Sequence, residues 1–247
     1  MKILLNPAFE SLRTFVKSVP GFFEKEGRVI YKGRNEIKVF KVGDIEINIK
    51  RYKVPMLFNR IIYTCFRDSK GKRAFYYPKQ LLEKGFETPE PIAYIELKKW
   101  GLINYSFFIS VHSPYTHTFY EFGNATEEQY FEVIKAFAHY TAKLHNAQIF
   151  HKDYSPGNIL FDKINGEYHF CLVDINRMSF GEVSMEKGCE NFARLWGQTH
   201  LFKLLAVEYA KERGFNQEEC IQIILRSRKK FWNKYKRKHL VKFDLDI

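Results

Sequence analysis

The spacing of apolar residues changes near residue 104, and this change constrains the fold more than any other feature of the chain. Before it, three short segments alternate apolar and polar residues, which is typical of half-buried strands. They span residues 28–32, 36–41 and 44–52. Gly33 and Gly43 lie where turns between these segments are needed. The pattern predicts an antiparallel meander.

After residue 125 the apolar residues recur at spacings of three and four, which is the period of a helix that packs on one side. Residues 126–148 form the longest such segment, and Thr126 is in position to cap its N-terminus. Two further helices are predicted, over roughly residues 190–212 and 217–238.

A β-rich part followed by an α-rich part predicts an α+β protein with two lobes. We expect the N-lobe to span residues 1–103 and a connecting strand to span residues 104–111. The helical C-lobe would then occupy residues 112–247 and end in a basic helix.

The composition indicates a globular chain with anionic partners. The 247 residues are 45% hydrophobic, which is enough for a sizeable core. The 40 Lys and Arg exceed the 28 Asp and Glu, and the resulting charge of +12 favours nucleotides, nucleic acid, acidic lipids or phosphorylated sugars. No segment approaches the ~20 apolar residues of a membrane span, and the N-terminal apolar run is too short for a secretory signal. We expect a soluble or peripheral protein.

The cysteines are scattered along the chain, without the CxxC or His spacing of a zinc site. They are Cys65, Cys171, Cys189 and Cys220. Reduced thiols in a cytosol are the simplest interpretation, so we expect no disulfide framework.

The segment HKDYSPGNIL, residues 151–160, places an acid and an amide around one Pro-Gly turn. Asp153 and Asn158 lie between a predicted helix and an apolar segment, and Asp174 follows the apolar residues FCLV. Phosphoryl transfer needs such a set, because one Asp orients and deprotonates the attacking hydroxyl while the Asn and a second Asp bind Mg²⁺. Lys50, on the polar face of a predicted strand, is placed like the lysine that neutralises the nucleotide phosphates.

These residues resemble the protein-kinase-like superfamily. His151, Asp153 and Asn158 match its catalytic-loop pattern HxDxxxxN, and Asp174 in VDIN stands at the aspartate of the DFG motif. The resemblance implies a two-lobed kinase-like fold that uses ATP and Mg²⁺. It implies Asp153 and Lys50 as catalytic residues, Asn158 and Asp174 as metal ligands, and a scaffolding role for His151.

Within that superfamily, the chain is similar to the small bacterial lipopolysaccharide core kinases, the Kdo and heptose kinase group. The similar segments are TPEPIAYIE at residues 88–96, HKDYSPGNIL and VDINRM, within a resemblance over roughly residues 31–192. It implies an anionic glycolipid or sugar as acceptor, with a hydroxyl of the lipopolysaccharide core phosphorylated and Kdo as one candidate sugar. Only 11 residues separate DINRM from the helix expected near Glu190, which is short for a regulatory activation loop.

The nucleotide-binding side departs from the superfamily pattern. The phosphate-covering turn has one glycine, so Gly33 and the backbone of Arg34 and Asn35 would approach the phosphates, with the Arg34 charge in compensation. Asn48 stands where most kinases have a small apolar residue against the adenine. Asn48 would therefore hydrogen-bond the base or restrict the choice of nucleotide.

The adenine itself is expected to hydrogen-bond the backbone of Ser110, Val111 and His112, a role without a side-chain signature. On the segment of the kinase helix C, Tyr76 or Tyr77 replaces the usual glutamate partner of the lysine. Glu83 is the nearest acid.

Two other functions remain open at this stage. One is a kinase of a protein or small-molecule hydroxyl, since the acceptor rests on the resemblance alone. The other is a nucleotide-binding pseudokinase, which the absent helix-C glutamate favours. The individual residues also have structural explanations, because Asp153 and Asn158 suit a turn and Lys50 suits a solvated strand.

The C-terminal segment is strongly basic. Nine Lys and Arg and no acid lie between Cys220 and Phe243, with Phe231, Trp232 and Tyr235 interleaved. A solvated helix and a peripheral contact with the inner face of the cytoplasmic membrane both explain this pattern. Nucleic acid is the least favoured partner, because no nucleic-acid module accompanies the charge. The expected location is the cytoplasm, where the basic helix would be solvated or would contact the inner face of the membrane.

Overall fold

The computed structural model describes residues 1–66 and 68–247. Its internal contacts divide these residues into a first unit, Met1–Pro114, and a second unit, Tyr115–Ile247. This division lies later along the chain than the lobe boundary expected at residue 103. The reason is that the expected connecting strand belongs to the sheet of the first unit.

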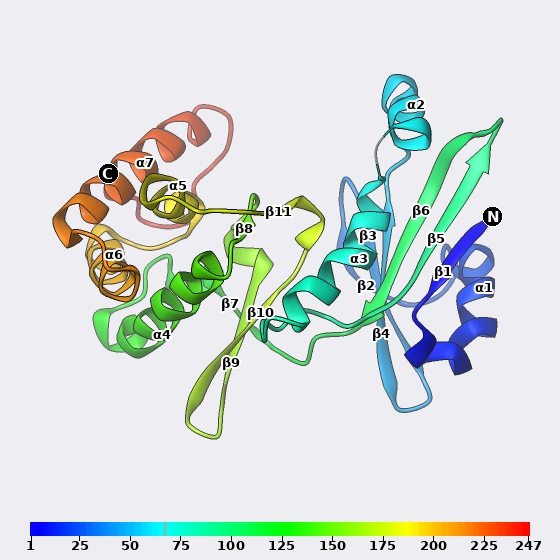
Figure 1. Ribbon diagram of the computed structural model, residues 1–247, viewed down its shortest axis with the longest axis horizontal. Helices are drawn as coiled ribbons and strands as arrows, with labels where there is room; N and C mark the ends of the chain where they lie inside the picture. Colours follow the sequence, from blue (N-terminus) through cyan, green and yellow to red (C-terminus); the bar gives the residue numbers. More distant parts are fainter. Residues whose placement is uncertain (67) are drawn as a thin grey trace. The chain divides into compact units, whose positions relative to one another are not determined.

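The first unit contains a six-stranded sheet with the order β1-β5-β6-β4-β3-β2 (Figure 1). All neighbouring strands are antiparallel. The strands are β1 (Lys2–Leu5), β2 (Arg28–Lys32), β3 (Glu36–Val42), β4 (Ile45–Tyr52), β5 (Pro91–Lys99) and β6 (Leu102–Val111). The predicted meander is thus confirmed as β2 to β4.

Helices cover both faces of this sheet. They are a 3-10 helix (Pro7–Leu12), α1 (Arg13–Phe22), α2 (Leu57–Cys65) and α3 (Lys70–Leu82). Val16 and Val19 of α1 pack in one core with Ile95 of β5. Successive strand side chains point to opposite faces. Tyr94, next to Ile95, accordingly lies against Gly71 of α3, where an added Cβ would come within 2.6 Å of the Tyr94 ring.

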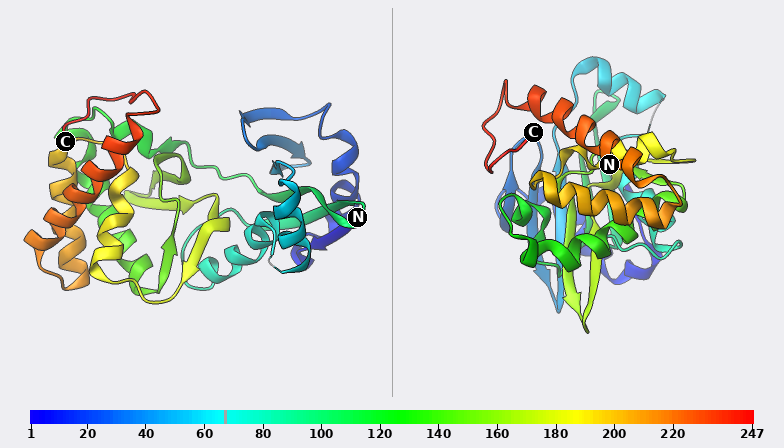
Figure 2. Two further views of the ribbon diagram at one scale, coloured as in Figure 1. Left: turned by 90° about the horizontal axis from the view of Figure 1, so that it is seen from above. Right: turned by 90° about the vertical axis from the view of Figure 1, so that its left-hand side faces the viewer.

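The second unit combines short strands with helices. A three-stranded sheet has the order β10-β9-β7, and β8 pairs with β11. The strands are β7 (His117–Thr118), β8 (Ile149–His151), β9 (Ile159–Ile164), β10 (Glu167–Leu172) and β11 (Met178–Phe180). The helices are α4 (Glu127–Asn146), α5 (Met185–Glu190), α6 (Thr199–Arg213) and α7 (Gln217–Tyr235), with 3-10 turns at Phe119–Phe122, Pro156–Asn158, Ile175–Arg177 and Asn191–Arg194. Helices α4, α6 and α7 stack in order (Figure 2).

The first predicted helix is confirmed and the second begins later than expected. Thr126 caps α4 through a reciprocal pair of hydrogen bonds with Gln129. The helix expected over 190–212 starts only at Thr199, because Gly197 adopts a φ of 140° that interrupts the helix. The Thr199 N–H instead donates to the carboxylate of Asp246, at 2.8 and 2.9 Å from its two oxygens.

The basic C-terminal helix is α7, which ends at Tyr235 rather than near residue 238. Its aromatic residues pack internally. Trp232 is 2% exposed and lies 5.1 Å, centroid to centroid, from Phe243. Arg228 is also buried and donates to the carbonyls of Gly197 and Asp246.

Candidate active site

The loop after β8 is fixed by the buried side chain of His151. The Asp153 N–H donates to His151 Nδ1 at 3.1 Å, so Nε2 carries the hydrogen and donates to the Val173 carbonyl at 3.1 Å. Complete burial lowers the pKa of this imidazole, which therefore stays neutral. His151 joins the loop to the end of β10 and has the scaffolding role expected from the sequence.

The second part of the loop joins Asn158 to the same strand end. Asn158 Nδ2 donates to the Asp153 carbonyl at 2.8 Å, and the Val173 N–H donates to the Asn158 carbonyl at 3.0 Å. Asp174 follows with a left-handed backbone (φ 54°), and its Oδ1 accepts a hydrogen bond from Asn176. This conformation is uncommon for a residue other than glycine and is found at functional sites. The structure therefore brings Asp153, Asn158 and Asp174 together.

Two arginines that the sequence analysis missed hold the Asp153 carboxylate. Arg177 Nη1 lies 3.2 Å from Oδ2, and Arg194 Nη1 donates to Oδ1. Arg177 is visible in the motif VDINRM, whereas Arg194 lies in a segment expected to be plain helix. Both oxygens of the expected base are thus occupied by guanidinium groups.

A buried network of hydrogen bonds stabilises the loop through the His151 carbonyl. Asn191 Nδ2 donates to the His151 carbonyl at 3.0 Å, and Asn191 Oδ1 accepts from His145 Nε2 at 3.1 Å. His145 Nδ1 then accepts from the Tyr209 hydroxyl at 2.8 Å, and Arg213 donates to Tyr209 Oη at 2.8 Å. Burial lowers the pKa of His145 to about 3, so it remains neutral. No sequence pattern signals this network, because its members are far apart in the chain.

Lys50 lies on β4 in the first unit, opposite Ile37 of β3 and Phe108 of β6. It is 8% exposed, and its Nζ lies 5.4 Å from the centre of the Tyr52 ring. A lysine this buried is not the solvated strand residue considered from the sequence.

Helix α3 occupies the segment where the sequence analysis looked for a partner of Lys50. Tyr76 on this helix is 46% exposed. Glu83 follows the helix at its C-cap and forms an exposed ion pair with Lys79, 3.7 Å away. Glu83 is therefore engaged at the surface by its own helix.

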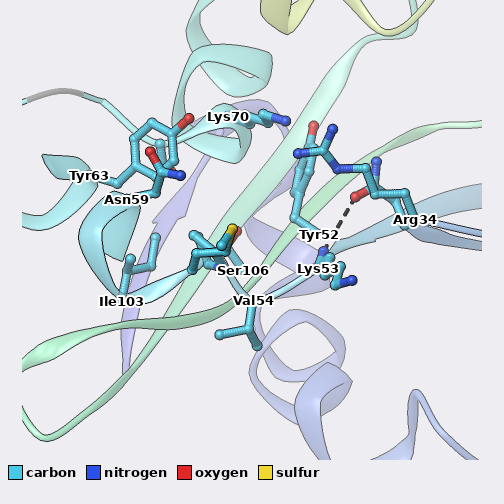
Figure 3. A pocket seen from close by; sticks show the side chains of 13 residues that line it. Arg34, Tyr52, Lys53, Val54, Asn59, Tyr63, Lys70, Ile103 and Ser106 are labelled. Atoms are coloured by element: carbon cyan, nitrogen blue, oxygen red, sulfur yellow. Dashed lines mark hydrogen bonds between the residues drawn. The ribbon is translucent and has the colours of Figure 1, made fainter. Parts of the chain in front are cut away.

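The turn between β2 and β3 borders a cavity of about 300 Å³ in the first unit (Figure 3). Arg34, Asn35, Lys53 and Lys70 supply its polar wall. Asn35 Oδ1 accepts from the Lys53 N–H at 3.3 Å, which ties the turn to the end of β4. Among the described residues, those lining this cavity do not include Lys50 or Asn48.

Gly33 has no left-handed backbone, and its nearest neighbour is the movable end of the Tyr31 side chain. A Cβ at this position would lie 2.6 Å from the Tyr31 hydroxyl. The Gly33 N–H donates to the Asn35 carbonyl at 3.0 Å. The Gly33 N–H is thus hydrogen-bonded within the turn. Of the three residues expected to approach the phosphates, Arg34 and Asn35 are the ones whose N–H groups suit that contact.

Strand pairing limits which backbone groups of residues 110–112 can contact an adenine. Asn48 pairs with Ser110 in the register of β4 and β6. The Val111 N–H donates to the Glu90 carbonyl at 2.9 Å, and the His112 N–H donates to the Glu46 carbonyl at 2.8 Å. Both N–H groups are engaged within the sheet. In this conformation the backbone of Val111 and His112 offers an adenine only its carbonyl oxygens.

An antiparallel sheet that carries a buried lysine, followed by a helical unit in which Asp153, Asn158 and Asp174 lie around the end of β10, is the arrangement of the protein-kinase-like fold. A solved structure described as WaaP in complex with acyl carrier protein has this fold. It aligns with a TM-score of 0.65 over 95% of this chain and 100% of that chain, at 14% sequence identity. No curated protein sequence matches this chain.

The family follows from the sequence match. The model of the lipopolysaccharide kinase (Kdo/WaaP) family matches residues 24–199, and the chain belongs to this family and is a kinase. Across the described residues, no helix combines the length and apolar character that crossing a membrane requires.

Proposed function

We propose that the protein transfers the γ-phosphate of ATP to a sugar hydroxyl of the lipopolysaccharide core, with Kdo as the first acceptor to test. The family match supports the lipopolysaccharide part of this proposal. The observation that carries the reaction type is that Asn158 is hydrogen-bonded both to Asp153 and to Val173, the residue before Asp174.

In this reaction Asp153 orients the acceptor hydroxyl and takes its proton. The hydroxyl oxygen forms a bond to the γ-phosphorus, the bond from that phosphorus to the β–γ bridging oxygen breaks, and ADP leaves. Arg177 and Arg194 each contact one carboxylate oxygen, and each oxygen keeps a second lone pair that can accept from the acceptor hydroxyl. The two guanidinium groups would then neutralise charge on the transferred phosphoryl group.

The residues of the first unit are proposed to hold the nucleotide. Lys50 neutralises the α and β phosphates, while Arg34 and Asn35 approach them through the backbone of the turn after Gly33. Asn48 and the backbone carbonyls of residues 110–112 are proposed to contact the adenine.

Asn158 and Asp174 fit a magnesium ion. Asn158 uses Nδ2 to hold the Asp153 carbonyl, so its Oδ1 is the atom available as a ligand. Amide and carboxylate oxygens are the donors that Mg²⁺ prefers, and the ion would neutralise charge on the nucleotide phosphates. The described residues contain no group of three or more His, Cys, Asp or Glu that could hold a metal. A site completed by phosphate oxygens needs no such group.

The peripheral contact of α7 with the inner membrane stays a prediction, and only the positive charge of the helix supports it. Trp232 and Arg228 are buried, so neither is presented to a lipid surface. Any contact of this helix would rest on exposed lysines such as Lys229 and Lys230.

The test is Mg²⁺-dependent transfer of label from γ-labelled ATP into a lipopolysaccharide fraction. We expect incorporation into carbohydrate with the native chain and with Asp162→Asn, which makes the same exchange on β9, and none with Asp153→Asn. Incorporation that persists in Asp153→Asn would contradict the role of Asp153. Binding of ATP without transfer to lipopolysaccharide, isolated core sugars or protein would identify a pseudokinase.

A further inference from the structure

Helix α2 carries an unusual density of exposed apolar side chains. Within the described residues α2 has no buried side chain. Met56 is 80% exposed, Phe58 is 74% exposed and Phe66 is 83% exposed, while Leu57 and Ile61 are exposed to 64% and 43%. Single exposed apolar residues are ordinary, but five within eleven consecutive residues indicate an interaction surface.

The turn between β5 and β6 extends this surface. Arg60 of α2 donates to the carbonyls of Ile103 at 2.7 Å and Lys99 at 3.1 Å, and the Ile103 N–H donates to Thr64 Oγ1 at 3.0 Å. These bonds hold α2 beside the β5–β6 hairpin at one end of the sheet (Figure 1). Trp100, at the tip of that hairpin, is 85% exposed.

We call these six side chains the apolar cap. They are Met56, Leu57, Phe58, Ile61, Phe66 and Trp100. The contacts of Arg60 and Thr64 use the side of α2 that faces β6, which leaves Phe58, on the other side of the helix, without a role in the core.

Basic residues flank the apolar cap in the sequence. Residues 53–66 include Lys53 and Arg60 but no acid, although the Arg60 guanidinium is bonded to the hairpin. Lys98, 4.0 Å from Glu96, and Lys99 precede Trp100, and Lys99 Nζ lies 4.7 Å from the centre of the Trp100 ring. Asp68, the first acid after the helix, is paired with Lys72 at 2.6 Å.

We propose that the apolar cap inserts into the surface of an anionic lipid bilayer. Aliphatic and aromatic side chains and a tryptophan, with lysines such as Lys99 nearby, match the layering of acyl chains, interface and lipid phosphates. The cationic margin complements anionic headgroups, to which the net charge of +12 also draws the protein. A short helix that lies in the interface requires no spanning segment.

This inference goes beyond the proposed function, because it requires neither nucleotide nor phosphoryl transfer. It also differs from the membrane contact expected through α7, which relies on charge in the second unit. The two surfaces can therefore be tested separately.

The experiment measures cosedimentation of the full chain with vesicles of phosphatidylcholine, with and without phosphatidylglycerol. The cap variant combines Leu57→Ser, Phe58→Ser and Phe66→Ser, and Leu240→Ser is the matched control, because Leu240 is 83% exposed beside the basic C-terminal segment. We expect binding of the native chain to the anionic vesicles and at least about tenfold weaker partition of the cap variant. The control should bind like the native chain.

Fluorescence assigns the contact to the apolar cap. Vesicles should shift the tryptophan emission of the native chain to shorter wavelength, and Trp100→Phe should remove the shift. Thermal unfolding of the cap variant at the native temperature verifies its fold, which is expected because all three positions are exposed.

Several results would overturn the proposal. They are equal binding of the cap variant, equal binding to neutral vesicles, and loss of binding in Lys229→Glu with Lys230→Glu but not in the cap variant. Absence of vesicle binding, with cap-dependent binding of an acidic soluble protein instead, would assign the surface to a protein partner.

Discussion

The two units present their proposed site residues in different ways. In the second unit, direct hydrogen bonds join the loop residues His151 and Asn158 to Val173, next to Asp174. In the first unit, Gly33 lies in the turn after β2, Lys50 lies on β4 and the 110–112 segment lies at the end of β6, so their surroundings depend on the register of the sheet. The comparison shows that hydrogen bonds within the loop fix residues that the sequence presents as one short motif. The positions of residues that are spread over several strands depend instead on the pairing of distant strands.

The largest expected effect is on the locally held loop. Asp153→Asn should lower transfer about a thousandfold, because the amide cannot accept the hydroxyl proton. The free energy of unfolding should hardly change, since Arg177 and Arg194 are 50% and 39% exposed and such ion pairs contribute little. Labelled-phosphate transfer and urea unfolding measure both quantities. Activity within about tenfold of the native chain would remove Asp153 as the base.

A smaller effect is expected in the first unit. Lys50→Met should lower kcat/KM for ATP about a hundredfold, because a positive charge near the phosphates is lost while the packing volume is kept. Lys41→Met, an exposed change on β3, serves as the control. If Lys50→Met lowered activity as much as Asp153→Asn does, the expected difference between the two units would be wrong.

The buried network of the second unit should make stability depend on pH. The pKa of His145 is about 3 in the folded chain and near 6.5 when unfolded, so the unfolded state binds more protons between these values. The contribution of neutral His145 to the free energy of unfolding is fully present above about pH 6.5 and decreases as the pH falls. The loss is about 2 kcal/mol at pH 5. Urea unfolding at pH 7.5 and pH 5 should show it, and His145→Gln should reduce it. An unchanged pH dependence in that variant would exclude His145 as the source.

The smallest effect concerns the phosphate-covering turn. Gly33→Ala should raise KM for ATP by about threefold, because the new Cβ meets the Tyr31 hydroxyl, whose side chain is 51% exposed and able to move. Adding Tyr31→Ala should restore the native KM. A large defect that Tyr31→Ala leaves in place would show that the phosphates approach Gly33 itself.

Local patterns predicted a large part of this structure. Alternation located β2, β3 and β4, and helical spacing with Thr126 located α4. The HxDxxxxN pattern located the loop because its hydrogen bonds join residues close in sequence.

The features that escaped prediction depend on distant parts of the chain. The backbone of residues 110–112 was expected to contact the adenine, but no sequence pattern indicated that the Val111 and His112 N–H groups bond to Glu90 and Glu46. Arg194 reaches Asp153 across 41 positions, and His145 reaches Tyr209 across 64. Neither pairing leaves a periodic or spacing signal in the sequence.

The contact of Asp246 with Thr199 affects the order in which the second unit can be synthesised and folded. Residue 246 supplies the acceptor for the first turn of α6 and a carbonyl for buried Arg228, so neither is satisfied until the chain has grown 47 residues past Thr199. Tyr209, which steadies the loop through His145, lies on that same helix. On the ribosome the loop that carries Asp153 would therefore emerge before the segment around Asp246 that completes its support.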